Sequence, residues 1–169
     1  ASGYAAIYDV GALPYIGIAG QAYYKKFLER PLPRAFAIGQ HGAASTNGGF
    51  DPIAHAMNLC NQRGPGCRIY AVDNTVVWTR PTPVPPPSNF AKLDDASAIP
   101  YVSDSGRAGY QKFLQLPRPR VFTIAPDGGW DFSALGPDPV KYSLDHCGQH
   151  HQGCKIYAVD SSVVWQGTK

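Results

Sequence analysis

The chain is poor in charge and has no long apolar run. Only 16% of its 169 residues are Asp, Glu, Lys or Arg, and the formal net charge is +3 at pH 7. So small a charge does not predict the basic stripe that proteins binding nucleic acid usually carry, and we expect no nucleic-acid partner. No apolar stretch approaches the length of a transmembrane helix, so we expect no transmembrane segment.

Short motifs that identify common enzymes are absent as well. The sequence has no G-x-S-x-G, no H-E-x-x-H, no G-x-x-x-x-G-K-[ST] and no C-x-x-C-H. A Ser-His-Asp triad stays open, because triads assemble from distant positions, and His41 lies close to Ser45 and Thr46. We predict no catalytic residue and no cofactor, and an enzyme is the less favoured hypothesis.

The strongest positive feature is an internal repeat. Residues 9–42 align without a gap with residues 95–128, and sixteen of these thirty-four positions are identical. Residues 58–78 align with residues 145–165, with twelve identities in twenty-one. The offset changes from 86 to 87 in between, so one residue is inserted in the least similar stretch. We expect residues shared by both copies to serve the fold, whereas residues of one copy are free for another role.

Proline marks the boundary between the copies. Pro-rich residues 80–88 favour polyproline II and lack the donors of a sheet ladder. We therefore predict a first repeat module over residues 1–79, a Pro-rich linker over 80–94 and a second module over 95–169. The linker is interpreted as a solvated spacer, with a ligand for a proline-binding domain as the alternative.

The four cysteines predict one disulfide in each copy. Cys60 and Cys67 are separated by six residues, and so are Cys147 and Cys154. In the loop-entropy model a loop this short contributes about 2.5 kcal/mol. A zinc site is the weaker alternative, because the spacing differs from the usual C-x2-4-C.

Disulfides indicate an oxidising compartment, and the start of the chain at Ala1 without an initiator Met fits a mature exported protein or a trimmed chain. We predict export to the bacterial periplasm, the outer surface or the extracellular space.

Periodicity predicts an α+β fold in which each copy is an α-β-α-β-β module. The small antiparallel sheet is expected to carry its helices on one face, and the other face to be open or packed on the second copy. A glycine-rich loop follows the first strand, and Asp51-Pro52 and Asp138-Pro139 start the second helices. The predicted helices are residues 21–29, 52–60, 108–115 and 139–147, and the predicted strands are 34–39, 69–72, 75–78, 120–125, 156–159 and 162–165.

Repeated aromatic residues on the hairpins are candidates for partner binding, with core packing and carbohydrate stacking as alternatives. In a single-copy position, Trp130 follows Gly128-Gly129 and fits either a turn with a packing tryptophan or a sugar site. The partner-binding candidates are Trp78, Trp130, Trp165, Tyr70 and Tyr157.

Three histidines of the second copy are candidates for a metal site. His146, His150 and His151 lie within six residues, and three imidazoles can bind a transition metal. The first copy has no histidine at the aligned positions, so the fold does not require them. Gly148 is expected to break the helix between His146 and His150, which leaves exposed loop histidines as the alternative.

Other charged residues are assigned to the surface and to turns. Asp73 and Asp160 follow strands at positions that fit tight turns. Four arginines flank prolines, and we expect them to be solvated: Arg30, Arg34, Arg118 and Arg120.

The pattern Cys-x6-Cys-x-Ile-Tyr-Ala-Val-Asp-x-x-Val-Val-Trp occurs in both copies. It resembles small modules of exported proteobacterial proteins whose function is unknown. The resemblance implies export and one fold for both copies, and it implies no catalytic residue.

Three functional hypotheses follow. The leading one is a non-catalytic exported protein that binds or bridges a protein partner, for example as an accessory subunit of a larger assembly. The second is a metal-dependent or hydrolytic enzyme centred on His146, His150 and His151 with Asp145. The third is a polysaccharide-binding protein that uses Trp130, Tyr23 or Trp165.

Overall fold

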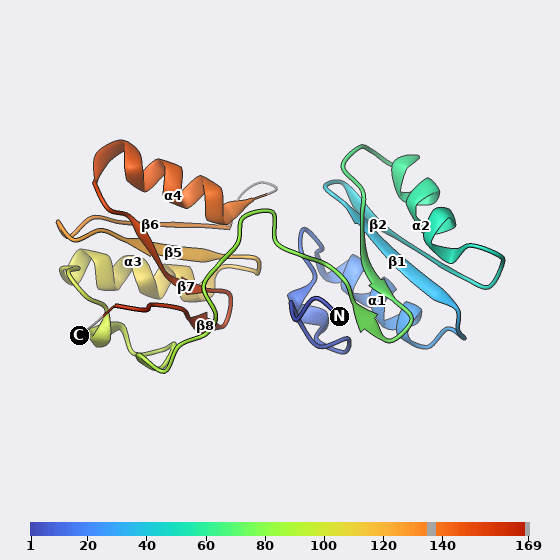
Figure 1. The fold of residues 1–169 in the computed structure, drawn as a ribbon, viewed down its shortest axis with the longest axis horizontal. Helices are drawn as coiled ribbons and strands as arrows, with labels where there is room; N and C mark the ends of the chain where they lie inside the picture. The colour runs from blue at the N-terminus through green and yellow to red at the C-terminus, as the bar shows by residue number, and fades with distance from the viewer. Residues whose placement is uncertain (135–137, 168–169) are drawn as a thin grey trace. The chain divides into compact units, whose positions relative to one another are not determined.

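The computed structural model describes residues 1–134 and 138–167 and divides into two compact units, which we call module 1 (Ala1–Thr79) and module 2 (Arg80–Lys169) (Figure 1). Module 1 contains η1 (Val10–Ala12), α1 (Ile18–Leu28), β1 (Arg34–Gly39), β2 (Gly42–Asn47), α2 (Pro52–Asn61), β3 (Arg68–Val72) and β4 (Thr75–Val76). Module 2 contains η2 (Ala96–Ala98), α3 (Asp104–Gln115), β5 (Val121–Ile124), β6 (Trp130–Ser133), α4 (Pro139–His150), β7 (Lys155–Val159) and β8 (Ser162–Val163).

The predicted α+β class, the duplication and the antiparallel sheets are confirmed. Each module has a four-stranded antiparallel sheet, in the order β2-β1-β3-β4 in module 1 and β6-β5-β7-β8 in module 2. The predicted disulfides Cys60–Cys67 and Cys147–Cys154 are also present. Each disulfide joins a helix to the residue that precedes the third strand of its module.

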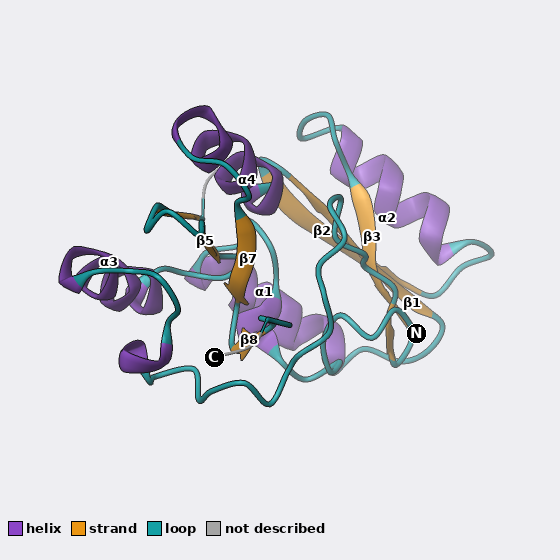
Figure 2. Cartoon of the chain, turned by 60° about the vertical axis from the view of Figure 1, so that its left-hand side comes forward, coloured by secondary structure: helices purple, strands orange, loops and turns teal. Residues whose placement is uncertain are grey.

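The expectation that the helices share one face of the sheet is wrong. Phe36 and Ile38 of β1 belong to the core cluster that contains residues of α1, whereas Ala35 and Ala37 belong to the cluster that contains residues of α2. Because alternate residues of a strand point to opposite faces, α1 and α2 cover opposite faces (Figure 2). Every residue of β1 is buried, which is the pattern of a strand covered on both sides.

The predicted glycine-rich loop contains a strand in each module. β2 pairs with β1 along its whole length, and β6 pairs with β5. Four of the six residues of β2 are Gly, Ala or Ser, which have little intrinsic preference for strands, so the pattern gave no signal. The inserted residue lies in the turn of this hairpin, since Ile38 pairs with Ala43 but Ile124 pairs with Trp130.

The expectation that Gly148 interrupts its helix is also wrong, because α4 continues to His150. Gly148 is exposed, and a glycine inside a helix costs only about 1 kcal/mol, which the packing of α4 offsets. The predicted starts of the second helices are confirmed. The Asp51 carboxylate accepts a hydrogen bond from the Ala54 N–H at 2.9 Å, and that of Asp138 accepts one from the Lys141 N–H at 3.1 Å.

Arg34 and Arg120 are structural, which corrects the expectation of solvated arginines. Arg34 is buried, and its guanidinium donates to the carbonyl oxygens of Phe27 at 3.0 Å and Arg30 at 2.8 Å, and to that of Leu28. The main-chain N–H of Arg34 donates to the Asp73 carboxylate at 2.9 Å. The arginine thus satisfies carbonyls at the end of α1 and ties them to the β3–β4 turn.

Arg120 repeats this arrangement in module 2. Its guanidinium donates to the carbonyl oxygens of Phe113 at 3.1 Å and Leu116 at 2.9 Å, and its main-chain N–H donates to the Asp160 carboxylate at 2.9 Å. Asp73 and Asp160 have left-handed backbone angles, with φ of 51° and 53°. The interpretation of these aspartates as turn residues is therefore confirmed.

The repeat begins earlier in the structure than in the alignment. The Ser2 N–H donates to the Val76 carbonyl at 3.0 Å, and the Ser88 N–H donates to the Val163 carbonyl at 2.8 Å. Residues 2–16 and 88–102 therefore play the same part in their modules. Residues 88–94, which the sequence places in the linker, belong to this segment of module 2.

Within the described residues, no helix is both long and apolar enough to span a lipid bilayer.

Candidate functional site

Four of the five aromatic partner-binding candidates lie in the cores of their own modules. Tyr70 and Tyr157 are completely buried, and Trp78 and Trp165 are nearly so. Trp78 packs beside Tyr70 at 6.2 Å between ring centroids, and Trp165 beside Tyr157 at 6.5 Å. They are buried because a helix covers the sheet face that the sequence left open. Little of these four side chains is left for a partner, although Trp165 lines a pocket of module 2 beside Leu144 and Ile156.

Trp130, the fifth candidate, fills a space between β6 and α3. Its ring stacks beside Phe122 and beside Phe132, at 6.1 Å between centroids in each case. A Cβ atom at Gly109 of α3 would lie 2.3 Å from the indole, and one at Gly106 would lie 3.0 Å from it. The two glycines of α3 thus leave room for the Trp130 ring, which is partly buried.

Module 1 has an open cleft in the corresponding place. Ala43 of β2 stands at the position of Trp130, and Tyr23 of α1 at that of Gly109. The Tyr23 ring lies 6.0 Å from Phe36, on the inner side of the space, and leaves a cleft of about 490 Å³. The lining residues come from the start of α1, from the β1–β2 hairpin and from the end of α2: Tyr15, Ile16, Gly17, Gly20, Tyr23, Gln40, His41, Gly42, Ala43 and Arg63.

The cleft combines ring surfaces with hydrogen-bond donors. Tyr15 and Tyr23 offer aromatic faces, and Gln40, His41 and Arg63 offer polar groups. The Arg63 guanidinium donates to the Ala43 carbonyl, which holds the cation at the cleft. Such a lining suits a ligand group that has a ring and a hydrogen-bond acceptor or negative charge.

This cleft was not predicted from the sequence, although the exchange of Tyr23 for Gly109 offered a partial signal. Position 23/109 lies between identical residues, Ala22/Ala108 and Tyr24/Tyr110, yet changes from tyrosine to glycine, whereas position 43/130 lies in the stretch where the two copies do not align. The paired change shows that a large ring enters from the helix in one copy and from the strand in the other. Only the structure shows that the first arrangement leaves an opening.

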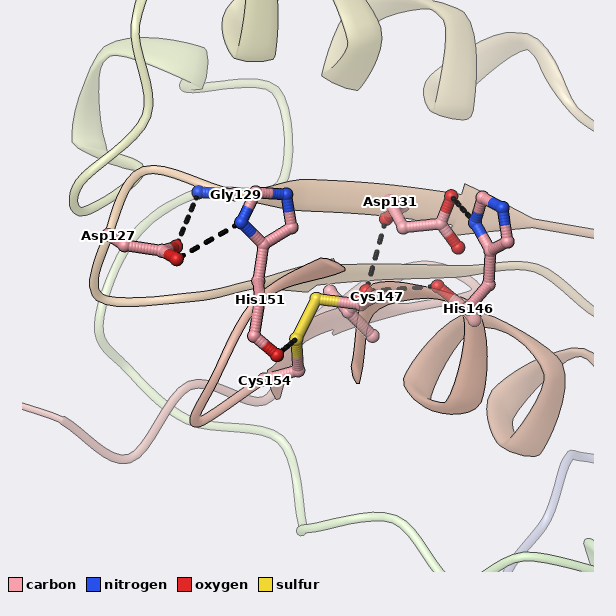
Figure 3. The surroundings of a disulfide bond; sticks show 9 residues. Asp127, Gly129, Asp131, His146, Cys147, His151 and Cys154 are labelled. Atoms are coloured by element: carbon pink, nitrogen blue, oxygen red, sulfur yellow. Dashed lines mark hydrogen bonds and ion pairs between the residues drawn. A yellow bond between two sulfur atoms is a disulfide. The ribbon is translucent and has the colours of Figure 1, made fainter. Parts of the chain in front are cut away.

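The candidate metal-site histidines His146 and His151 point to different carboxylates (Figure 3). His146 Nδ1 lies 3.2 Å from Asp131 Oδ1, and His151 Nδ1 lies 3.1 Å from Asp127 Oδ2. The two pairs lie on different sides of the Cys147–Cys154 disulfide. His150 is beside His146, with 5.7 Å between ring centroids.

The described part of the chain contains no group of three or more His, Cys, Asp or Glu side chains arranged to hold a metal ion. Each histidine–aspartate pair supplies two ligands, whereas zinc sites in proteins usually take three or four from the protein. The structure thus brings His146 and His151 to separate carboxylates, not to the single site that the sequence suggested.

Asp127 has the clearest electrostatic effect at these pairs. The Gly129 N–H donates to its carboxylate at 3.0 Å, and this bond, together with the weaker effect of His151, lowers the pKa of Asp127. Each pair becomes an ion pair when its imidazole is protonated.

A buried polar contact distinguishes α4 from α2. Thr123 Oγ1 and Ser143 Oγ lie 3.0 Å apart between the sheet and α4. Module 1 has Ala37 and Ala56 at these positions, both completely buried. The two hydroxyls satisfy each other, as buried polar groups must, so this contact is part of the packing of α4.

Comparisons of the chain with models of protein families, with curated proteins and with solved structures found no match.

Proposed function

We propose that the chain is a non-catalytic exported protein that binds and bridges a protein partner, as an accessory subunit of a larger envelope or extracellular assembly. The observation that carries this proposal is the difference between the two copies. Their cores and their Arg34 and Arg120 contacts are duplicated, whereas the cleft beside Tyr23 occurs in module 1 and is closed by Trp130 in module 2.

Export is supported by the two disulfides, since such bonds persist in oxidising compartments. The repeated cysteine-to-tryptophan pattern, which resembles modules of exported proteobacterial proteins, supports the same location. The bacterial periplasm, the outer surface and the extracellular space all meet this condition.

The cleft of module 1 is the proposed contact site for the partner. An aromatic side chain of the partner would stack on Tyr23 or Tyr15, and a neighbouring acidic group would meet Arg63.

A polysaccharide is the second candidate ligand, because Tyr23, one of the residues named for that hypothesis, lines the cleft beside Gln40 and His41. An aromatic face with amide and imidazole groups suits a sugar ring as well as a side chain. Trp165, another residue named for that hypothesis, is nearly buried and lines a different pocket, in module 2.

The test blocks the cleft and leaves the fold intact. Gly42 lines the cleft, and a Cβ added there meets no atom within 4 Å, so Gly42→Phe should fill the opening without strain in the backbone. The matched control is Gly148→Phe, because a Cβ at Gly148 in module 2 also meets no atom within 4 Å. Partners are captured by crosslinking in the native envelope, and glycans are screened on an array.

We expect Gly42→Phe to abolish a specific crosslink that the wild-type protein and Gly148→Phe both give. A glycan signal that Gly42→Phe removes would favour the polysaccharide instead. A crosslink that Gly42→Phe leaves unchanged would contradict the cleft as the contact site.

A further inference from the structure

The Pro-rich residues 80–86 are seated on module 2 in an alternating manner. Arg80, Thr82 and Val84 are partly buried, whereas Pro81 and Pro83 between them are exposed. An extended chain directs alternate side chains to opposite sides, so one side of this segment faces the module. The segment therefore contacts module 2 as an extended peptide ligand would, although it belongs to the same chain.

Each inward side chain of the segment has a specific receptor in module 2. Arg80 forms an ion pair with the Asp160 carboxylate, and the Thr82 hydroxyl donates to the Asp138 carboxylate. Val84 packs against the apolar cluster that contains Val121, Val140, Ile156, Val159 and Val164.

The main chain of the segment is held where it joins the module. The Gln166 side-chain amide donates to the Pro86 carbonyl at 3.2 Å, and the Ser88 N–H donates to the Val163 carbonyl at 2.8 Å. The segment can be followed in Figure 1 as the green chain beside β7 and β8.

Module 1 retains this receptor. Asp73 aligns with Asp160, and Asp51 aligns with Asp138, so both carboxylates are kept. The aliphatic positions are kept as well, except that Ala35 replaces Val121, with Ile53 at the position of Val140 and Val77 at that of Val164. We call the set Asp51, Ile53, Ile69, Asp73 and Val77 the retained surface.

The retained surface is open to solvent where its counterpart in module 2 is covered. Val140 is 3% exposed, but Ile53 is 43% exposed. Val164 is 2% exposed, but Val77 is 37% exposed. These aliphatic side chains lie at equivalent places of one fold but differ in exposure. In module 2 a segment covers them, whereas the described residues of module 1 provide no such segment.

We propose that the retained surface of module 1 binds an extended, proline-rich segment of a partner polypeptide. The segment has the chemistry of residues 80–84: an arginine, a hydroxyl residue two positions later and an aliphatic residue two positions after that. The occupant is argued from module 2, where a segment of this kind lies on the aligned receptor. This inference rests on the proposed role in protein binding and names a second contact surface.

Physical chemistry favours this occupant. The Asp73 carboxylate, at the position of Asp160, suits the arginine, and that of Asp51, at the position of Asp138, suits the hydroxyl donor. The aliphatic side chain between the prolines would cover Ile53 and Val77. A proline-rich segment is already extended when free, so it loses less conformational entropy on binding than a flexible one. The retained surface includes Asp51 and Ile53 at the start of α2, whereas the cleft is lined by residues of α1, of the β1–β2 hairpin and by Arg63 after the end of α2, so the two sets share no residue.

The test titrates the full chain, labelled with ¹⁵N, with a synthetic peptide that has the sequence of residues 79–87. A scrambled peptide of the same composition is the control ligand. The test variant is Ile53→Ser with Val77→Ser, since both side chains are exposed and the fold should tolerate the change. The control variant is Ile18→Ser, because Ile18 is also an exposed aliphatic residue but lies on α1.

We expect the peptide to shift amide signals of module 1 at the retained surface. The affinity for the peptide should fall about tenfold or more in the double variant and stay unchanged in Ile18→Ser. Shifts confined to module 2, equal shifts with the scrambled peptide, or an unchanged affinity of the double variant would each overturn the inference. So would the absence of any shift at millimolar peptide.

Gly42→Phe separates this inference from the cleft. We expect that variant to bind the peptide as the wild type does, even where it loses the crosslink in the envelope. Peptide binding with an unaltered crosslink in Gly42→Phe would support the retained surface and contradict the cleft. Loss of the crosslink without any peptide binding would support the cleft and contradict the retained surface.

Discussion

The indole of Trp130 lies against the backbone of Gly109, so closely that a Cβ atom there would be 2.3 Å from the ring. Module 1 reverses the two sizes, with Tyr23 on the helix and Ala43 on the strand. Each module therefore has one large ring at this helix–strand contact, supplied from opposite sides. The side from which the ring comes decides whether the space is filled, as by Trp130 in module 2, or left as a cleft, as beside Tyr23 in module 1.

Gly109→Ala should destabilise module 2 by about 1–3 kcal/mol, because the added methyl group overlaps the indole. Alanine favours helices more than glycine does, so helix propensity alone predicts the opposite sign. Gly148→Ala in α4 is the matched control, since its Cβ meets no atom within 4 Å, and it should raise the stability by about 0.5–1 kcal/mol. Urea unfolding measures both values.

A second substitution distinguishes overlap with the indole from a general defect in α3. Combined with Trp130→Ala, the Gly109→Ala change should cost much less than it does alone, which gives a coupling energy between contacting residues. Equal costs in both backgrounds would show that the two residues do not interact as described.

Arg34→Lys should destabilise module 1 by about 2–3 kcal/mol. An ammonium group cannot reproduce the planar set of donors that meets several carbonyls of α1 and the turn after β3. Arg30→Lys is the control, because the Arg30 guanidinium makes an exposed bond of 3.4 Å to Asn47 and lies 6.0 Å from the Tyr23 ring, so the change should alter the stability by less than about 0.5 kcal/mol. Denaturant unfolding followed by far-ultraviolet circular dichroism tests the pair, and similar values for both would refute the structural role.

Alkaline pH should unfold the protein through its buried tyrosines. Burial, with a smaller effect of Asp95, raises the pKa of Tyr157 to about 12, and burial also raises the pKa of Tyr24 and Tyr110. The folded state favours the neutral phenol, so the stabilisation is complete below the ordinary pKa of about 10 and is lost as the pH rises through the folded value. Absorbance at 295 nm and circular dichroism should change together.

Tyr157→Phe tests this origin of the alkaline transition. The Tyr157 hydroxyl has no hydrogen-bond partner within the described residues, so its removal should leave the stability at neutral pH equal or higher. The alkaline midpoint of module 2 should move to higher pH. A midpoint unchanged from the wild type would assign the transition to other groups.

Asp127 should keep its charge at lower pH in the folded protein than in the unfolded chain, because the Gly129 N–H and then His151 lower its pKa. The stabilisation is complete above the ordinary value of 3.8 and is lost as the pH falls through the folded value. His151→Ala should raise the pKa of Asp127 only part of the way, since the Gly129 bond, the larger effect, remains. Carboxyl ¹³C shifts measure this, and a return to the ordinary value would contradict the order of the causes.

The sequence predicted those parts of the fold that repeat identically. The cysteine spacing gave both disulfides, and the Asp-Pro pairs gave the starts of α2 and α4. β2 was missed because its small residues have the composition of a loop, and only pairing with β1 makes them a strand. The break of α4 at Gly148 was predicted wrongly, because the low helix propensity of glycine was considered without the packing of α4.

The candidate site was predicted less well, because it depends on contacts between residues far apart in the chain. Repetition correctly indicated that Trp78 and Tyr70 serve the fold, but the expectation of an open sheet face made them binding candidates. Which strand residues face α2 follows from the register of the sheet, which the alternation alone does not fix. The cleft depends on a pair of exchanges, Tyr23 for Gly109 and Ala43 for Trp130, whose partners become visible only once helix and strand are in contact.

The bond between Ser2 and Val76, repeated between Ser88 and Val163, brings the entry and the exit of each module to the same edge of its sheet. A domain with adjacent ends can be copied and joined head to tail without rebuilding its interior. Gene duplication would therefore have needed little more than a short connector, and arrays of three or more such units are physically permitted. In such an array, every connector would lie on the unit that follows it, as residues 80–86 lie on module 2.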